Sequence, residues 1–365
     1  MAVLRVNATR DGALFVPGSA GAWQGALDDA LRALPAGAAV CVLVHGYRFS
    51  WRAHRGGRAH HCPQSRLYNT ETVAPGAGRR PCRAAWPRAL GFGEAEAGLC
   101  IAFGWDGRRD PLRALGFSGR NAFSLVYEAA AQAGSALALI LDRIAERRPD
   151  VTVDFLTHSL GARVALAAMG ARPAARLGRA VLLGAADYAG VAERVLEAQD
   201  RAGGSTVVYH VLSRANDLYD GLFRLFAPRP ERAGDRTLGE AGLLEALPAP
   251  ARARHARRWI DLQLDQERLA RLLASRGIIL ARAAERITHW HFYADEGAMA
   301  AWRAILERAP GWEIADLRLR GLGAGTDPRW SRLLPARPDW RLAGGARSTA
   351  ERPQGSGPDA AATAP

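Results

Sequence analysis

The stretch from Val151 to Met169, VTVDFLTHSLGARVALAAM, decides the fold. Its first half is a β-branched, apolar run that favours a strand, and its second half has small apolar residues at helical spacing. Between the two halves stands Thr157-His158-Ser159-Leu160-Gly161. The pattern predicts a strand, a sharp turn and a helix, with Ser159 at the apex and its hydroxyl beside the helix N-terminus.

Short apolar runs elsewhere in the chain are bounded by turn residues: Val40 to Val44, Leu99 to Phe103, Ala180 to Leu183 and Val207 to Leu212. Runs of this kind fit strands that are buried on both faces of a parallel sheet. Helical patterns alternate with them, the longest over Ala122 to Arg147. The alternation predicts an α/β fold with a mostly parallel sheet flanked by helices.

We expect one domain over residues 1–335, interrupted by two irregular insertions. Residues 51–96 and about 220–258 are rich in Arg, Pro and Gly, and we predict loops or a small cap there. A helix is predicted over Leu262 to Ser275. Residues 336–365 contain few large apolar side chains, so we predict a disordered tail.

Several polar groups follow the predicted strands directly. His45-Gly46-Tyr47, Ser159, Asp187 and Asp217 all stand at such positions. Ligand sites in open α/β sheets lie at the carboxyl ends of the strands. A serine nucleophile needs a base, a group that orients the base, and N–H donors for the oxyanion. The chain offers candidates for each role in the order Ser, Asp, His.

These motifs resemble the α/β-hydrolase superfamily, and within it uncharacterised bacterial esterase/lipase-like members of unknown function. The resemblance covers roughly residues 1–310. It depends on the segments VCVLVHGYRFS, LCIAFGWDG, FLTHSLGARVAL, VYHVLSRANDLYD and THWHFYADEGAMAAW. It implies the α/β-hydrolase fold with cap-like insertions and an active site built around the serine turn.

The resemblance also implies a role for each motif residue. Ser159 matches the nucleophile, Asp217 the acid and His289 the base, while the backbone N–H groups of Tyr47 and Leu160 match the oxyanion hole. The implied activity is that of a serine hydrolase, of the carboxylesterase or lipase class, acting on an ester or related acyl substrate through an acyl-enzyme. A non-catalytic scaffold that binds a ligand or partner is the alternative function.

Some assignments stay open at this point. Asp187 competes with Asp217 for the acid, because both follow a strand, and His291 competes with His289 for the base. Asp220 precedes Gly221 and indicates a turn. Thr157 stands where the nucleophile turn usually has its first glycine, and no clear final strand precedes His289.

Composition excludes other function classes. The net charge is +13, but every basic residue is Arg, which indicates coding bias rather than phosphate contacts, so we expect no nucleic-acid partner. We also expect no membrane span and no signal peptide, hence a cytoplasmic protein. The sequence does not indicate an oligomeric state.

Cysteine and histidine spacing predicts no metal site. Cys41 and Cys100 stand in strand-like runs and are expected to be core thiols. The remaining group combines two cysteines with a run of histidines, and its spacing fits no structural zinc pattern: His54, His60, His61, Cys62 and Cys82. A serine hydrolase needs no cofactor, so none is expected.

Overall fold

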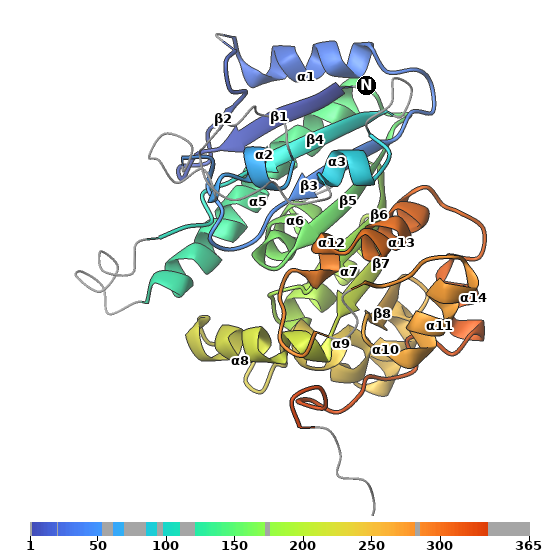
Figure 1. The fold of residues 1–365 in the computed structure, drawn as a ribbon. Coiled ribbons are helices and arrows are strands. Elements are labelled where there is room, and N and C mark those ends of the chain that lie inside the picture. Colours follow the sequence, from blue (N-terminus) through green and yellow to red (C-terminus); the bar gives the residue numbers. More distant parts are fainter. Residues whose placement is uncertain are drawn as a thin grey trace, which may run out of the picture.

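An eight-stranded sheet forms the centre of the computed structural model (Figure 1). Its order is β2-β1-β4-β3-β5-β6-β7-β8; β1 and β2 pair antiparallel and all other pairs are parallel. The strands are β1 Ala2–Ala8, β2 Leu14–Phe15, β3 Val40–Val44, β4 Leu99–Gly104, β5 Thr152–His158, β6 Arg176–Leu183, β7 Val207–Leu212 and β8 Trp259–Gln263. The predicted α/β class is confirmed, and the architecture is compatible with the α/β-hydrolase fold.

The structure describes residues 2–19, 21–52, 61–68, 85–92, 98–109, 121–171, 176–281 and 285–334. The predicted tail over 336–365 and much of the 51–96 insertion lie outside these ranges. Within that insertion, the described parts include two short helices, α2 Pro63–Arg66 and α3 Trp86–Ala89.

Helices cover both faces of the sheet, as Figure 1 shows. Successive side chains of a strand point to opposite faces, so Val42 and Val44 enter one core while Cys41 and Leu43 enter the other. The first face carries α1 Trp23–Arg32, α5 Ala122–Arg147, α6 Leu160–Gly170, α7 Ala189–Arg201, α9 Leu238–Ala246 and α10 Ala249–His255. The second carries α3, α11 Glu267–Ser275, α12 His291–Ala294, α13 Glu296–Leu306 and α14 Ile314–Leu319.

The helix α5 packs tightly on α6. A Cβ added at Gly134 would lie 2.5 Å from the Cβ of Ala167, so only a glycine allows this approach. Among the described helices, α5 is also long and apolar enough by length and composition to cross a membrane, but 67% of its apolar window is buried within the molecule. A core helix of a globular domain passes the same test.

The second predicted insertion, about 220–258, includes α9 and α10, whose residues Leu238, Leu243 and Ala251 join the first core. It also includes most of α8 Asp217–Phe226, which lies at the edge of the molecule (Figure 1).

The final strand, β8, was not predicted from its sequence WIDLQ. Its Asp261 is buried and accepts hydrogen bonds from Trp259 Nε1 at 2.8 Å and from the backbone N–H groups of Leu243 and Leu244 at 3.1 Å each. A polar residue satisfied in this way can stand inside a sheet. The helix predicted from Leu262 accordingly begins later, at Glu267.

The thiols of Cys41 and Cys100 are buried, as predicted. Burial raises the pKa of each thiol above its ordinary value, so both stay protonated. Of the remaining cysteine and histidine group, only His61 and Cys62 belong to the described residues.

Candidate active site

The turn at Ser159 has the predicted strand–turn–helix form, between β5 and α6. Ser159 has φ 54° and ψ −126°, a conformation that residues other than glycine rarely adopt. Its N–H donates to Leu183 O at 2.9 Å, and its C=O accepts from Ala186 N at 3.2 Å. The end of β6 therefore holds the serine in its strained geometry.

Two glycines let the turn after β3 approach this serine. A Cβ added at Gly46 would lie 2.7 Å from the Cβ of Ser159, and one at Gly161 would collide with Val44 O and His45 O. Thr157, at the usual glycine position, is fully buried in β5, and its hydroxyl has no hydrogen-bond partner among the described residues. Gly46 and Gly161 therefore allow this close approach, without a glycine at position 157.

Two backbone N–H groups are available beside Ser159. Leu160 is the first residue of α6, where an N–H has no partner within the helix. Tyr47 follows Gly46 directly, next to the serine. In the part of the chain that the structure describes, neither N–H donates to a protein acceptor. Both amides predicted for the oxyanion hole can therefore still bind an oxyanion.

His45 fixes the turn that carries Tyr47. Its Nε2 accepts from Trp105 N at 3.1 Å, so Nδ1 bears the proton and donates to Gly46 O at 3.0 Å. Trp105 Nε1 donates to His45 O at 2.8 Å. Burial lowers the pKa of His45 to about 4, which keeps the ring neutral. His45 is thus a structural link between the ends of β3 and β4.

The ring of His289 lies next to the serine turn. Its centroid is 4.5 Å from that of His158, the residue before Ser159, and it stacks on Tyr219 at 4.6 Å. His158 Nε2 donates to the His289 carbonyl oxygen at 2.8 Å. No hydrogen bond joins Ser159 Oγ to the His289 ring within the described residues; catalytic bonds of this kind often tighten only with substrate.

Asn216 orients the His289 ring. Its Oδ1 lies 2.6 Å from His289 Nδ1, and its Nδ2 donates to Asp220 Oδ1 at 2.9 Å. Since Oδ1 can only accept, Nδ1 of the ring must carry the proton, and Nε2 is left as the base. The series Asp220–Asn216–His289 therefore presents the correct nitrogen for proton abstraction.

Asp220 and His289 are both buried enough to shift their pKa values. Burial, followed by the nearby Asp217 charge, raises the pKa of Asp220 to about 7. Burial, followed by repulsion from His291, lowers the pKa of His289 to about 3. The histidine is accordingly neutral, with Nε2 unprotonated, while Asp220 titrates near neutral pH.

Asp217 is the first residue of α8, a few residues beyond the end of β7, and its carboxylate contacts groups other than His289. It accepts from Arg214 Nη1 at 2.9 Å and from Trp330 N. Both Asp217 and the Arg214 side chain are fully buried, so the aspartate neutralises a charge inside the protein. The predicted Asp217–His289 bond is not formed among the described residues; the neighbouring Asn216 contacts the histidine instead.

Asp187, the alternative acid, is also fully buried and also paired. It accepts from Tyr127 Oη at 2.7 Å, from Arg163 Nη1 at 3.0 Å and from Tyr188 N at 2.9 Å. Its described partners do not include His289. Asp187 ties α5 and α6 to the end of β6.

His291, the alternative base, begins α12 and lines a small pocket with Asp265 and Arg332. His289 instead has the orienting bond to Asn216 and the ring contact with His158. The geometry therefore favours His289 as the candidate base.

Sequence reasoning missed Asn216 and underestimated Asp220. Both stand in SRANDLYD, where a search for a carboxylate in the orienting role favours Asp217. A signal was present, since an asparagine at a strand end can set a histidine tautomer as it does in cysteine proteases.

The chain was compared with known proteins in three ways. A scan against models of protein families, a search of curated proteins and a search of solved structures each found no match.

Proposed function

We propose that this protein is a serine hydrolase that cleaves a carboxylic ester or a related acyl substrate. The observation that carries the proposal is Ser159 in strained geometry, packed against the turn that carries the unbonded Tyr47 amide, near a histidine whose tautomer is set by Asn216. A serine at an ordinary helix cap needs none of these neighbours.

In the proposed reaction, Ser159 Oγ attacks the carbonyl carbon and His289 Nε2 takes its proton. The Leu160 and Tyr47 amides stabilise the negative oxygen of the tetrahedral intermediate. The leaving alcohol takes the proton from His289 as the ester bond breaks, which leaves an acyl group on Ser159. Water attacks that acyl-enzyme by the same route, releasing the acid and restoring the serine.

An asparagine as orienting residue changes the electrostatics of the base. The protonated His289 faces an amide dipole rather than a carboxylate, so its charge is stabilised less. Asp220, bonded to the amide from behind, supplies negative charge when ionised. Proton transfer is therefore expected to depend on the ionisation of Asp220.

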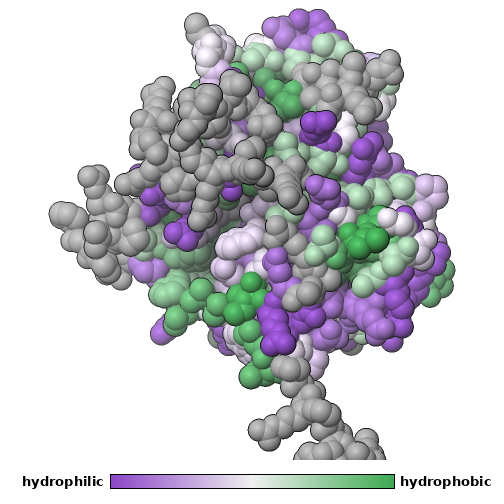
Figure 2. All heavy atoms as spheres, in the orientation of Figure 1, coloured by the Kyte–Doolittle hydropathy of each residue, from purple (hydrophilic) through white to green (hydrophobic). Residues whose placement is uncertain are grey.

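An apolar surface on α8 is a candidate for binding the acyl chain of a substrate. Side chains of α8 spaced one turn apart are exposed on one side of the helix: Leu218, Leu222, Leu225 and Phe226. In Figure 2 they form a green patch at the lower left, where Figure 1 shows α8. Because α8 starts directly after Asn216, this α8 apolar face can receive the hydrocarbon part of an ester.

A fluorophosphonate probe tests the proposal. We expect it to label the wild-type protein at Ser159 and to label Ser159→Ala not at all, with ester turnover lost to at least about 10³-fold below wild type. Ser135→Ala, an exposed serine of α5, is the matched control and should behave as wild type. Thermal unfolding would verify that all three proteins are folded.

A folded wild-type protein that neither reacts with the probe nor turns over any ester of a panel would overturn the hydrolase proposal. Ligand binding that is unchanged in Ser159→Ala would then support the alternative function, a scaffold without catalysis.

A further inference from the structure

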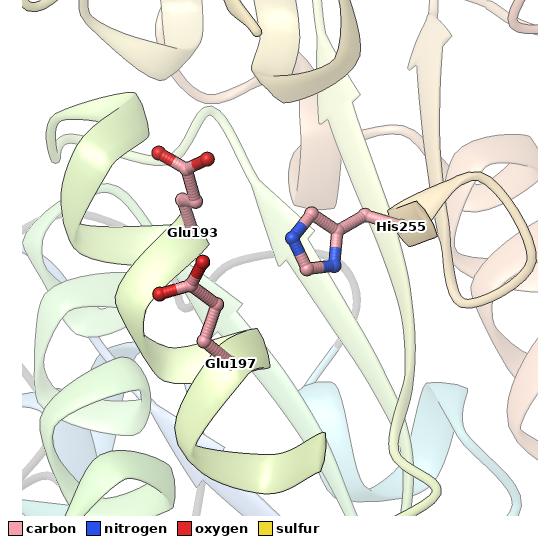
Figure 3. A group of neighbouring side chains, drawn as sticks. All are labelled: Glu193, Glu197 and His255. Atoms are coloured by element: carbon pink, nitrogen blue, oxygen red, sulfur yellow. The ribbon is translucent and has the colours of Figure 1, made fainter. Parts of the chain in front are cut away.

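Three ligand-type side chains meet on the first face of the sheet, between α7 and α10. Glu193 and Glu197 stand one turn apart on α7, and His255 ends α10. One potential ligand atom from each lies within 4.8 Å of the others. Figure 3 shows the His255 ring facing the two carboxylates across the gap between the helices.

His255 is the unusual member of this group. It is 1% exposed, and neither ring nitrogen has a hydrogen-bond partner among the described residues. Buried polar atoms nearly always have a partner, because losing water without replacing its hydrogen bonds is costly. Burial also lowers the pKa of His255, which favours the neutral ring, the form that binds metals.

The two glutamates carry the charge that a cation needs. Glu193 is 3.4 Å from Arg232 and Glu197 is 3.3 Å from Arg254. Both arginine side chains are more than half exposed, so they can swing into water without breaking a buried contact. Two carboxylates and one neutral imidazole would then balance a divalent ion.

We propose that Glu193, Glu197 and His255 bind a divalent transition metal, with zinc as the best match, and that this ion fastens α10 to α7. Imidazole and carboxylate ligands suit zinc, with water completing a tetrahedral shell. Ligands about 2.0–2.2 Å from one ion stand at most about 4 Å apart, so the three groups need to contract only slightly.

The position of the cluster indicates a structural role. Arg258, three residues after His255, donates to Leu196 O at 3.1 Å and pairs with Asp200, so the connection from α10 to β8 is already bound to α7. An ion at His255 would complete this attachment. The site is independent of the proposed hydrolase, since none of its residues belongs to the Ser159 site.

Isothermal titration with zinc chloride tests the inference on the full chain, without a histidine tag and after chelator treatment. We expect one zinc per chain and a rise in melting temperature. His255→Gln and the double variant Glu193→Gln with Glu197→Gln should each bind at least about tenfold more weakly, as expected when a ligand is lost. Should His255→Gln fail to fold, the partly exposed glutamate variant decides.

Two control variants locate the ion. His289→Gln separates this site from the histidines near Ser159, and Glu267→Gln removes an exposed glutamate of α11; both should keep wild-type affinity. No zinc binding by the wild type, unchanged affinity in the glutamate variant, or loss of binding in His289→Gln would each overturn the proposal.

Discussion

The ends of β6 and β7 are built alike but contribute differently to the candidate site. Each strand is followed by a fully buried aspartate that pairs with an arginine: Asp187 with Arg163, and Asp217 with Arg214. Only at β7 does the preceding residue, Asn216, contact the candidate base. An aspartate at a strand end is therefore not enough to identify the catalytic acid, because a nearby arginine can engage it.

The two arginines also differ in exposure. The Arg163 side chain is 16% exposed, whereas that of Arg214 is wholly buried, with Nε and Nη2 lacking partners among the described residues. Arg214 depends on Asp217 much more than Arg163 depends on Asp187. Asp217 is therefore expected to contribute to stability, whereas in the proposed function Asn216 orients the base.

The largest expected effect concerns stability. Asp217→Asn removes the carboxylate that is bonded to the buried Arg214 guanidinium, so we expect the free energy of unfolding to fall by about 3–5 kcal/mol. Asp187→Asn should cost less, about 2 kcal/mol, because Arg163 can reach water. Urea unfolding followed by circular dichroism measures both. If both variants lose the same free energy of unfolding, or if Asp187→Asn loses more, Arg214 does not depend on its aspartate more than Arg163 does.

The next effect concerns activity. Asn216→Ala removes the group that holds the His289 tautomer, and we expect kcat/KM to fall about 100-fold, or about 2.7 kcal/mol, with little change in stability. Asn216→Asp should retain activity, since a carboxylate also accepts from Nδ1. Ester hydrolysis at saturating and limiting substrate gives these constants. Normal activity in Asn216→Ala, together with loss in folded Asp187→Asn, would move the orienting role to β6.

A smaller effect is expected in the dependence of kcat/KM on pH. The pKa of Asp220 is about 7, so its ionisation should raise kcat/KM several-fold as pH rises through 7. The pKa of His289, about 3, is too low to produce this step. Asp220→Asn should abolish the step near pH 7 and leave a flat profile there. A step that persists in Asp220→Asn would assign it to another group.

Ionisation of Asp220 is expected to raise kcat/KM but to lower the free energy of unfolding. Its folded pKa is raised above the ordinary value of 3.8, so the folded state holds a proton that the unfolded state has lost. The stability that this proton contributes is present below pH 3.8 and is lost as pH rises through 7. Asp220→Asn should remove this dependence from unfolding curves measured between pH 4 and 7.

A last effect concerns the α8 apolar face, on the helix that follows β7. Leu222→Asp with Leu225→Asp should lower kcat/KM for long-chain esters about tenfold relative to acetate esters, because about two methylene contacts are lost. Leu319→Asp, an exposed leucine of α14, is the matched control. Equal losses for short and long esters would exclude the α8 apolar face as the acyl-binding surface.

Local patterns predicted the central part of the fold. The buried strands and the turn at Ser159 are encoded within single segments, where apolar runs and turn residues alternate. β8 was missed because Asp261 is satisfied by partners from α9 and β7, which the segment itself does not reveal. Tertiary contacts outweighed the local pattern there.

The candidate site was less predictable than the sheet. Ser159, Tyr47 and Leu160 follow from the chain on either side of a turn, whereas the Asn216–His289 bond joins residues from distant segments. The cluster of Glu193, Glu197 and His255 is hidden in the same way. Spacing in the sequence does not give the distance between such groups, so their proximity is seen only in the folded structure.

The close contact between Gly46 and Ser159 fixes the geometry of the serine turn independently of the segments around it. Because no side-chain carbon fits at Gly46, Ser159 and the turn that carries the Tyr47 amide are held close together, anchored by His45 and by the end of β6. In the proposed reaction, this contact sets the spacing between the attacking oxygen and the oxyanion donor. Changes elsewhere at the proposed site would then alter substrate preference without altering that spacing.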